Sequence, residues 1–224
     1  MRRSAATVLG VVMVTSLCAC GEEPGADLPV SNVVIEDGDG MRGVVLPEPY
    51  AVPAVQLSAT DGTSYSLASD ARDPLTLVFF GYTQCPDICQ VVMADIASAL
   101  TRLEDDERAQ VGMQFVTTDP ARDDEQTLRE YLDRFDPRFG GLTGPLPKII
   151  DAGQSLGIPV EKGRRLPSGG YEVDHGTQIV GVLPDATAPI VWTHGTSPEH
   201  LAEDIGKIVD SGVPDVHGQP AGIQ

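Results

Sequence analysis

The spacing of hydrophobic residues predicts strands and helices that alternate along the chain. The continuous apolar run 75–82 (LTLVFFGY) has the length of a strand and predicts one that is buried on both faces. A second run of strand length, 111–119 (VGMQFVTTD), predicts another buried strand. Each run is followed by a segment whose apolar residues recur every three or four positions, 87–106 and 124–135, as in an amphipathic helix. A shorter helix is predicted at 146–158. The first part of the fold is therefore expected to follow the order β-α-β-α.

Two more strands and a helix are expected in the C-terminal part. Residues 176–184 and 188–194 predict a strand pair that turns around Asp185. The last helix is predicted at 197–212, where an N-cap serine, a proline at the first helical position and a closing glycine delimit it (Ser197, Pro198 and Gly212). The whole order predicts an α/β fold with a central mixed sheet flanked by helices, an order that thioredoxin-like folds have.

The globular domain is expected to span 44–212. Its N-terminal part alternates apolar and polar residues around Asp61 and Gly62, which predicts a β-hairpin. Before the domain, 20–43 is rich in Gly, Glu, Asp and Pro and is interpreted as a flexible tether. After the domain, 213–224 is interpreted as a C-terminal tail.

The first twenty residues differ from the rest of the chain. Two arginines are followed by a short apolar stretch and small residues, which is the pattern of a secretory signal peptide over 1–19. The sequence Leu-Cys-Ala-Cys at 17–20 is similar to a bacterial lipobox, in which lipid is attached to the cysteine, here Cys20. Plain secretion with cleavage nearby is the alternative. The lipobox predicts a lipid-anchored protein of the cell membrane that faces the extracytoplasmic side.

The chain is acidic, with 33 Asp and Glu against 15 Lys and Arg among its 224 residues. Such a surface repels phosphate backbones, so nucleic acid is not expected as a partner. The apolar fraction of 41% is that of a globular protein. We interpret the acidic residues as a solvated surface that keeps the domain soluble.

Two cysteines, Cys85 and Cys89, stand where the predicted strand 75–82 is followed by a helix. We expect them to share one face at the start of this helix, where free backbone N–H groups and the helix dipole favour thiolates. Three functions fit such a pair: a passive disulfide, a thiol–disulfide exchanger, or two soft ligands for Cu(I) or Zn. Exchangers usually carry Cys-x-x-Cys, whereas the spacing here is Cys-x-x-x-Cys.

A metal site at the cysteines would need a third ligand, and the 4 histidines are the candidates. His200 falls in the last predicted helix and His217 in the tail, so both are expected to be solvated. His175 precedes a predicted strand and stands beside an aspartate that could steady an imidazole. His194 ends the next predicted strand. The spacing favours His175 only slightly and leaves both histidines open.

Three motifs, in the same order, resemble the Sco/SenC family of copper-binding assembly proteins. GYTQCPDIC (81–89) is similar to the family's Cys-Pro-Asp-x-Cys motif after a buried strand. TTDPARDDEQTLREYLDRFDPRFGGLTG (117–144) is similar to its Asp-Pro-x-Arg-Asp stretch, the following helix and the Phe-x-x-Leu-Thr-Gly ending. DHGTQIVGVLP (174–184) resembles the family's Asp-His pair followed by a strand. The likeness covers nearly the whole predicted domain, from about 44 to about 209.

The resemblance implies a thioredoxin-like domain that binds one copper, as Cu(I) or Cu(II), through Cys85, Cys89 and His175. It also implies that the protein helps to load the CuA centre in subunit II of cytochrome c oxidase, with another copper chaperone as a candidate donor. Such a protein is a metallochaperone rather than a turnover enzyme. A thiol–disulfide reductase that acts on the oxidase cysteines without transferring metal is the competing function.

Three further residues bear on this site. Gly176 follows the implied ligand His175 where the family often has a hydroxyl residue, and it is expected to loosen the loop that carries the ligand. Asp119 and Arg122 belong to the Asp-Pro stretch. We expect these two residues to cap the next helix, and a position near the metal site is the alternative.

Overall fold

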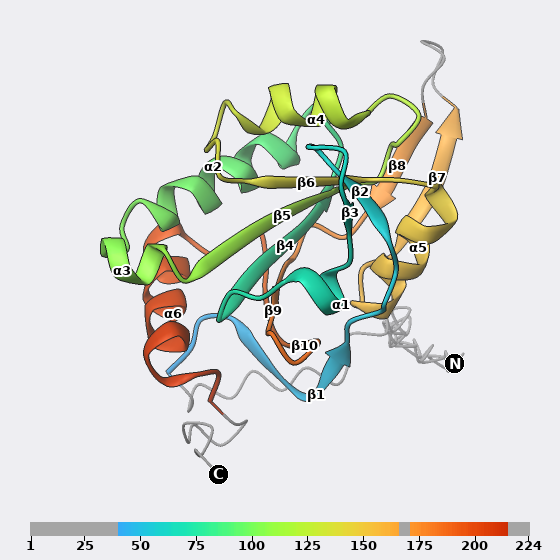
Figure 1. Cartoon of the computed structure of the whole chain (residues 1–224). Coiled ribbons are helices and arrows are strands. Elements are labelled where there is room, and N and C mark those ends of the chain that lie inside the picture. The colour runs from blue at the N-terminus through green and yellow to red at the C-terminus, as the bar shows by residue number, and fades with distance from the viewer. Residues whose placement is uncertain (1–39, 166–170, 215–224) are drawn as a thin grey trace, which may run out of the picture. The chain divides into compact units, whose positions relative to one another are not determined.

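An eight-stranded mixed sheet forms the centre of the protein (Figure 1). The structure is a computed structural model that describes residues 40–165 and 171–214, but not the side chains of 161–165 and 171–175. The predicted signal peptide, Cys20 and most of the predicted tether and tail lie outside the described residues. The strands are β1 (Val44–Ala51), β2 (Leu57–Ala59), β3 (Ser64–Tyr65), β4 (Leu75–Gly81), β5 (Val111–Thr117), β6 (Gly140–Thr143), β7 (Val160–Arg165), β8 (Tyr171–His175), β9 (Ile179–Val182) and β10 (Thr187–Trp192). The helices are α1 (Leu67–Asp70), α2 (Ile88–Leu100), α3 (Asp105–Arg108), α4 (Glu125–Leu132), α5 (Leu146–Ser155) and α6 (Pro198–Ser211).

The strand order in the central sheet is β1-β10-β9-β4-β5-β6-β2-β3. β4, β5 and β6 are parallel, and helices connect them, as parallel crossovers require. β9 runs antiparallel to β4, β10 antiparallel to β9, and β1 antiparallel to β10. The predicted central mixed sheet with flanking helices is therefore confirmed.

β4 is buried along its whole length and contributes to two hydrophobic cores. Leu75, Leu77 and Phe79 belong to one core, together with residues of α2, α4 and α6. Val78 and Phe80 belong to the other core, together with residues of α1 and α5. Because successive residues of a strand point to opposite faces, a strand between two cores needs the continuous apolar run that predicted it.

Two predicted helices begin where their capping residues indicate. α6 starts after Ser197, whose hydroxyl accepts a hydrogen bond from the backbone N–H of His200 at 3.3 Å, and it ends at Gly212 with a φ of 78°. α4 starts after Asp124, whose carboxylate accepts a hydrogen bond from the backbone N–H of Thr127 at 2.8 Å. These helix ends are determined by local sequence.

The segment 87–106, predicted as one helix, forms two helices. α2 ends at Leu100, and α3 begins after Glu104. Glu104 and Glu107 form a capping box, in which each side chain accepts a hydrogen bond from the backbone of the other. Because a capping box satisfies the free N–H groups of a new helix start, it favours a break in the helix at this point.

The sequence predicts the N-terminal hairpin but misses four strands, β1 and the three that follow here. β2 pairs with β3 across a turn in which Gly62 has a φ of 80°, so the hairpin is confirmed. β6 is a short run, GGLT, that pairs with β5 and β2. β7 and β8 pair only with each other, in a separate two-stranded sheet. Short or polar strands carry little periodicity, so pairing with distant residues determines them.

Asp204 on α6 joins three segments of the chain. Its carboxylate accepts hydrogen bonds from the backbone N–H groups of Arg42 and Gly43, both at 2.8 Å, and from the indole N–H of Trp192 at 2.9 Å. Trp192 ends β10 and is fully buried. These hydrogen bonds therefore fix the segment just before β1 to α6.

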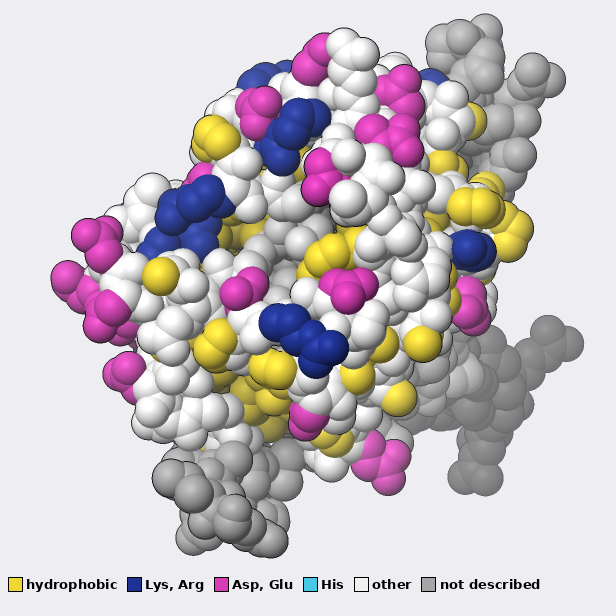
Figure 2. Space-filling view, in the orientation of Figure 1, with side chains coloured by type: hydrophobic (Ala, Val, Ile, Leu, Met, Phe, Trp, Pro, Cys, Tyr) yellow, Lys and Arg dark blue, Asp and Glu magenta, His cyan; other side chains and the backbone are white. Residues whose placement is uncertain are grey.

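Acidic side chains are spread over the face shown in Figure 2, with Lys and Arg side chains between them. This distribution agrees with the solvated acidic surface that the composition predicts. Among the described residues, no helix combines the length and the apolar character needed to cross a membrane.

Candidate metal centre

The two cysteines lie together at the carboxyl end of β4. Cys85 is in the loop that follows β4, whereas Cys89 is in the first turn of α2, which begins at Ile88. The prediction that both share a helical face is therefore wrong for Cys85. The two side chains are nevertheless hydrogen-bonded to each other, and both are free thiols. The loop therefore brings the side chains of Cys85 and Cys89 together, as the spacing predicts, although Cys85 is not in the helix.

Cys89 is the deeper of the two cysteines, with 0% of its surface exposed against 6% for Cys85. A Cβ atom on Gly81 would lie 3.1 Å from the Cys89 sulfur and 3.0 Å from the ring of Phe115. A Cβ atom at the end of β4 would therefore press against this thiol and the Phe115 ring, and the absence of one at Gly81 leaves both their space.

The environment of Cys89 favours the neutral thiol. Burial raises the pKa of Cys89, the hydrogen bond with Cys85 raises it further, and a backbone hydrogen bond with Tyr82 lowers it. The expected thiolate is therefore not favoured at Cys89, because the loss of solvation outweighs the backbone hydrogen bond with Tyr82. Binding of a metal ion at Cys89 must displace this proton.

Asp123 fixes the cysteine loop to the sheet and was not identified from the sequence. Its carboxylate, with the residue 1% exposed, accepts hydrogen bonds from the backbone N–H and hydroxyl of Thr83, at 2.9 and 2.6 Å. It also accepts one from the hydroxyl of Thr117 at 2.7 Å, at the end of β5. The hydroxyl of Thr143, on β6, donates to the Asp123 carbonyl at 2.9 Å. Asp123 therefore positions the loop relative to two strands.

Asp119 and Arg122 lie against the cysteine loop. They form an ion pair with each other. Arg122 also donates a hydrogen bond to the side chain of Gln84 at 3.4 Å, and its guanidinium lies 6.0 Å from the ring centroid of Tyr82. The expectation that the two residues cap the next helix is wrong, because Asp124 is the N-cap of α4. They support the loop in which Cys85 stands.

Tyr82 gives the cysteine pair a partly buried phenol as a neighbour. Burial raises the pKa of Tyr82 to about 12, and the charges of Cys85 and Cys89 act in the same direction. The Tyr82 hydroxyl is therefore neutral at physiological pH and acts at this site through hydrogen bonds, one of them with Cys85.

The backbone of His175 enters the same end of the sheet. His175 is the last residue of β8, where it pairs with Val160. β9 begins at Ile179, which pairs with Phe79 near the carboxyl end of the antiparallel strand β4. The chain from His175 to β9 therefore approaches the end of the sheet from which the cysteine loop leaves. The side chain of His175 lies outside the described residues, so its role as a ligand stays a prediction.

Hydrogen bonds hold the segment between β8 and β9. The backbone N–H of Gly176 donates to the carbonyl of Pro159 at 3.3 Å. The hydroxyl of Thr177 lies 3.1 Å from Nδ1 of His194, an exposed residue that follows β10. The structure therefore brings the second candidate histidine against the loop that follows the first.

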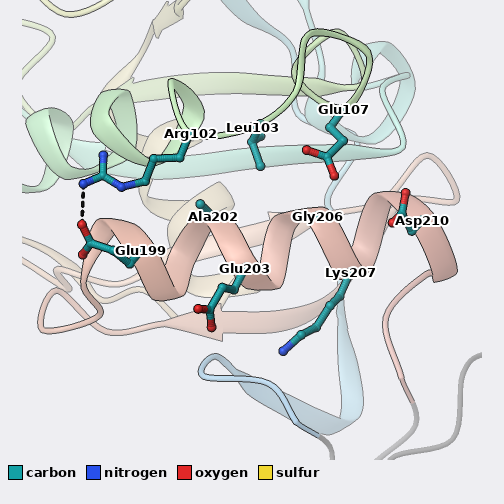
Figure 3. A pocket seen from close by; sticks show the side chains of 9 residues that line it. All are labelled: Arg102, Leu103, Glu107, Glu199, Ala202, Glu203, Gly206, Lys207 and Asp210. Carbon is teal, nitrogen blue, oxygen red and sulfur yellow. Dashed lines mark hydrogen bonds and ion pairs between the residues drawn. The ribbon is translucent and has the colours of Figure 1, made fainter.

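A groove of about 460 Å³ lies elsewhere, between the turn after α2 and helix α6 (Figure 3). Arg102 and Glu199 form an ion pair in it. No residue of the cysteine loop lines this groove. Among the side chains that the structure describes, no three His, Cys, Asp or Glu residues are grouped as a metal site.

The comparison with known families concerns most of the domain. A family model described as SCO1/SenC matches residues 51–210. The chain belongs to the SCO1/SenC family. The matched range contains the predicted ligands Cys85, Cys89 and His175 as well as Asp123.

Relatives in this family share the sequence and the fold. Protein SenC of Rhodobacter capsulatus is 32% identical over 164 residues, which cover 69% of this chain and 73% of that protein. The chain spans only about half the length of the mitochondrial SCO2 homologues that it also matches.

Two solved structures extend the comparison. The copper-bound structure of Bradyrhizobium japonicum ScoI has a TM-score of 0.60 and 27% identity, and the likeness covers 72% of this chain and 98% of that one. BsSco, described as a member of the Sco family of cytochrome c oxidase assembly proteins with a disulfide switch, has a TM-score of 0.60 and 22% identity, covering 75% and 95%. The predicted thioredoxin-like fold is thereby confirmed.

Proposed function

We propose that this chain binds one copper ion through Cys85, Cys89 and His175 and takes part in the assembly of cytochrome c oxidase. The observation that carries the proposal is the contact between two free, buried thiols at the carboxyl end of β4. The path of the backbone from His175 to β9 supports the third ligand. The copper in the structure of Bradyrhizobium japonicum ScoI supports the choice of metal.

The donor set suits copper on chemical grounds. Two thiolates and an imidazole are soft or borderline ligands, which favour Cu(I) over hard cations. The same sulfurs form a redox pair: a disulfide of a partner protein could oxidise them to a disulfide, which would reduce the partner to a dithiol and release the metal. Holding copper and releasing it can therefore depend on the same two atoms.

For the recipient, we propose the CuA site in subunit II of the oxidase, and for the location, the outer face of the cell membrane. The description of BsSco as an oxidase assembly protein supports the first proposal. The lipobox-like sequence that ends at Cys20 supports the second. A lipid anchor and a tether would keep the domain near a membrane-bound partner.

The competing function is thiol–disulfide exchange without metal transfer. The Cys85 thiolate would attack a disulfide of the partner and form a mixed disulfide. The Cys89 thiolate would then attack Cys85, which releases the partner as a dithiol and leaves a Cys85–Cys89 disulfide. The contact between the two free thiols suits this reaction equally well.

A copper titration distinguishes the two functions. Reduced protein is titrated anaerobically with Cu(I) and separately with Cu(II), as wild type and as Cys85→Ser, Cys89→Ser and His175→Ala. We expect about one copper per chain in the wild type and a loss of affinity of at least about tenfold in each variant, because each removes a ligand. His200→Ala is the matched control, since His200 is exposed on α6. Unchanged copper affinity in His175→Ala, together with intact exchange activity, would assign the protein to the reductases.

A further inference from the structure

The β7–β8 hairpin that ends at His175 is not a part of the central sheet. β7 and β8 form a two-stranded sheet of their own, whereas β9 pairs with β4 and β10 in the central sheet. Strand pairing therefore does not fix the end of β8 relative to the end of β4. The loop 176–178 joins the two sheets, so the contacts of this loop bear on where His175 stands.

The loop lies level with the end of β4. Ile179, the first residue of β9, pairs with Phe79 in the antiparallel ladder between β9 and β4. Continued by two residues, this register brings Thr177 level with Gly81. The sulfur of Cys89 lies against Gly81, 3.1 Å from the position of a Cβ atom. The loop that follows His175 therefore enters the sheet beside the buried cysteine.

Gln178 links this loop to the C-terminal end of α5. Its side-chain NH₂ group donates a hydrogen bond to the carbonyl of Gly157 at 3.1 Å. Gly157 has a φ of 68°, and its N–H donates to the carbonyl of Gln154 in α5 at 3.1 Å. A Cβ atom on Gly157 would overlap the hydroxyl of Tyr50. The acceptor of the Gln178 hydrogen bond is therefore part of a closely packed helix end.

Gly176 leaves the space that the Gln178 side chain fills. A Cβ atom on Gly176 would overlap the side-chain amide of Gln178. Because the glycine has no side chain, this amide lies against it and still reaches Gly157. The sequence led us to expect that Gly176 loosens the loop. The structure shows instead that Gly176 permits a hydrogen bond that a larger residue would disturb.

His194 links the same loop to a second part of the protein. Its Nδ1 atom is hydrogen-bonded to the hydroxyl of Thr177 at 3.1 Å. His194 stands in a tight turn, in which the N–H of Thr196 donates to the carbonyl of Thr193 at 3.0 Å. The turn connects β10 to α6. The partner of Thr177 is therefore carried by a short connection between two packed elements.

We propose that Gln178 and His194 are positioning residues, whose hydrogen bonds hold the loop 176–178 and thereby fix His175 at the copper site. The inference rests on the proposed function, in which His175 is a ligand. A ligand that is held in place before the metal arrives loses less freedom on binding. Loss of either hydrogen bond should therefore speed the release of copper.

The first test needs no copper. Nitrogen-15 relaxation of the reduced protein gives the order parameters of the backbone N–H groups of 176 and 177. In Gln178→Ala and in His194→Ala we expect these order parameters to fall from about 0.85 to below about 0.6. His200→Ala is the control, since His200 is exposed on α6. Unchanged order parameters in both loop variants overturn the proposal.

The second test follows the release of copper. Protein loaded with one Cu(I) is mixed anaerobically with excess bathocuproine disulfonate, a chelator whose Cu(I) complex absorbs visible light. We expect Gln178→Ala and His194→Ala to release copper about threefold to tenfold faster than wild type, because each loses one hydrogen bond. Release at the wild-type rate in both variants overturns the proposal.

Conservative variants separate the hydrogen bonds from the shape of the loop. Thr177→Val removes the hydroxyl and should release copper as fast as His194→Ala, whereas Thr177→Ser keeps the hydroxyl and should behave as wild type. Gly176→Ala should act like Gln178→Ala, and the double variant should be no faster than either, because both remove the same hydrogen bond. Equal rates in Thr177→Val and Thr177→Ser contradict the role of His194.

A cycle with His175→Ala shows whether the effect passes through the ligand. In this background Gln178→Ala and His194→Ala should cause no further acceleration. An acceleration as large as in the wild-type background overturns the proposal. Failure of the wild type to bind copper, or release at the wild-type rate from His175→Ala, would instead overturn the proposed function. The relaxation measurement would then still decide whether the two side chains hold the loop.

Discussion

Asp123 and Thr83 are joined by two hydrogen bonds, at 2.9 Å from the backbone N–H and 2.6 Å from the hydroxyl of Thr83 to the two carboxylate oxygens. The pair links the cysteine loop to the segment between β5 and α4, 40 residues further along the chain. The loop that carries Cys85 is therefore held by a buried charge from outside it.

Replacement of Asp123 by asparagine should destabilise both the fold and the site. One carboxylate oxygen becomes an NH₂ group that faces a donor, so at least one charge-assisted hydrogen bond is lost. We expect the free energy of unfolding to fall by about 2–4 kcal/mol and copper affinity to fall with it. Denaturant unfolding measures the first effect and copper titration the second.

The adjacent residue gives a matched control for this substitution. Asp124→Asn changes the N-cap of α4, where asparagine serves as well as aspartate, so stability should stay within about 0.5 kcal/mol of wild type. Equal losses in Asp123→Asn and Asp124→Asn would contradict the assigned role of Asp123.

Replacement of Gly81 by alanine should disturb the buried thiol directly. The new Cβ would lie 3.0 Å from Phe115 and 3.1 Å from the sulfur of Cys89, which is closer than ordinary contact. We expect a loss of about 1–3 kcal/mol in unfolding free energy and weaker copper binding. Gly195→Ala is the control, because a Cβ there meets nothing within 4 Å. Normal stability and normal copper binding in Gly81→Ala would show that the pocket of Cys89 is less tightly packed than described.

The ion pairs of Asp136 predict a loss of stability in acid. Burial acts to raise the pKa of Asp136, but hydrogen bonds from Arg138 and Arg108 lower it from 3.8 to about 2. A lowered pKa in the folded state stabilises the protein above the unfolded pKa, and the stabilisation disappears as the pH falls from about 4 towards 2. Because the side chain is 14% exposed, we expect at most about 2 kcal/mol.

The pH dependence is measured by denaturant unfolding at intervals between pH 5 and pH 2. Asp136→Asn removes the titrating group, so the variant should be less stable at pH 5 and should lose less stability on acidification. Parallel curves for the variant and wild type would assign the acid sensitivity to other carboxylates.

Sequence alone predicts those parts of the fold that are determined locally. The continuous apolar run of β4, the largely apolar run of β5 and the caps of α6 suffice to place these elements. β6, β7 and β8 are determined by pairing with distant segments, and the break after α2 depends on the capping box at Glu104, which competes with a continuous apolar stripe.

The residues of the candidate site also fall into two groups, those that local sequence predicts and those that it does not. Cys85 and Cys89 are recognisable because their spacing and position after a strand are local features. Asp123 is not, because its role arises where the loop after β4 meets the ends of β5 and β6. The aspartates at 119, 123 and 124 look alike in the sequence, yet one pairs with an arginine, one holds the cysteine loop and one caps a helix.

The lipid anchor is tested by moving the proposed attachment cysteine. Burial of an acyl chain in the bilayer is a hydrophobic interaction that high salt does not weaken, whereas an acidic chain gains nothing from anionic lipid. We expect wild type to remain with membranes in a high-salt wash and Cys20→Ala to be released into the soluble fraction. Cys18→Ala is the matched control and should remain with the membranes, since Cys18 lies within the predicted signal peptide. Retention of Cys20→Ala in the washed membranes would rule out lipid at this residue and would require another means of attachment.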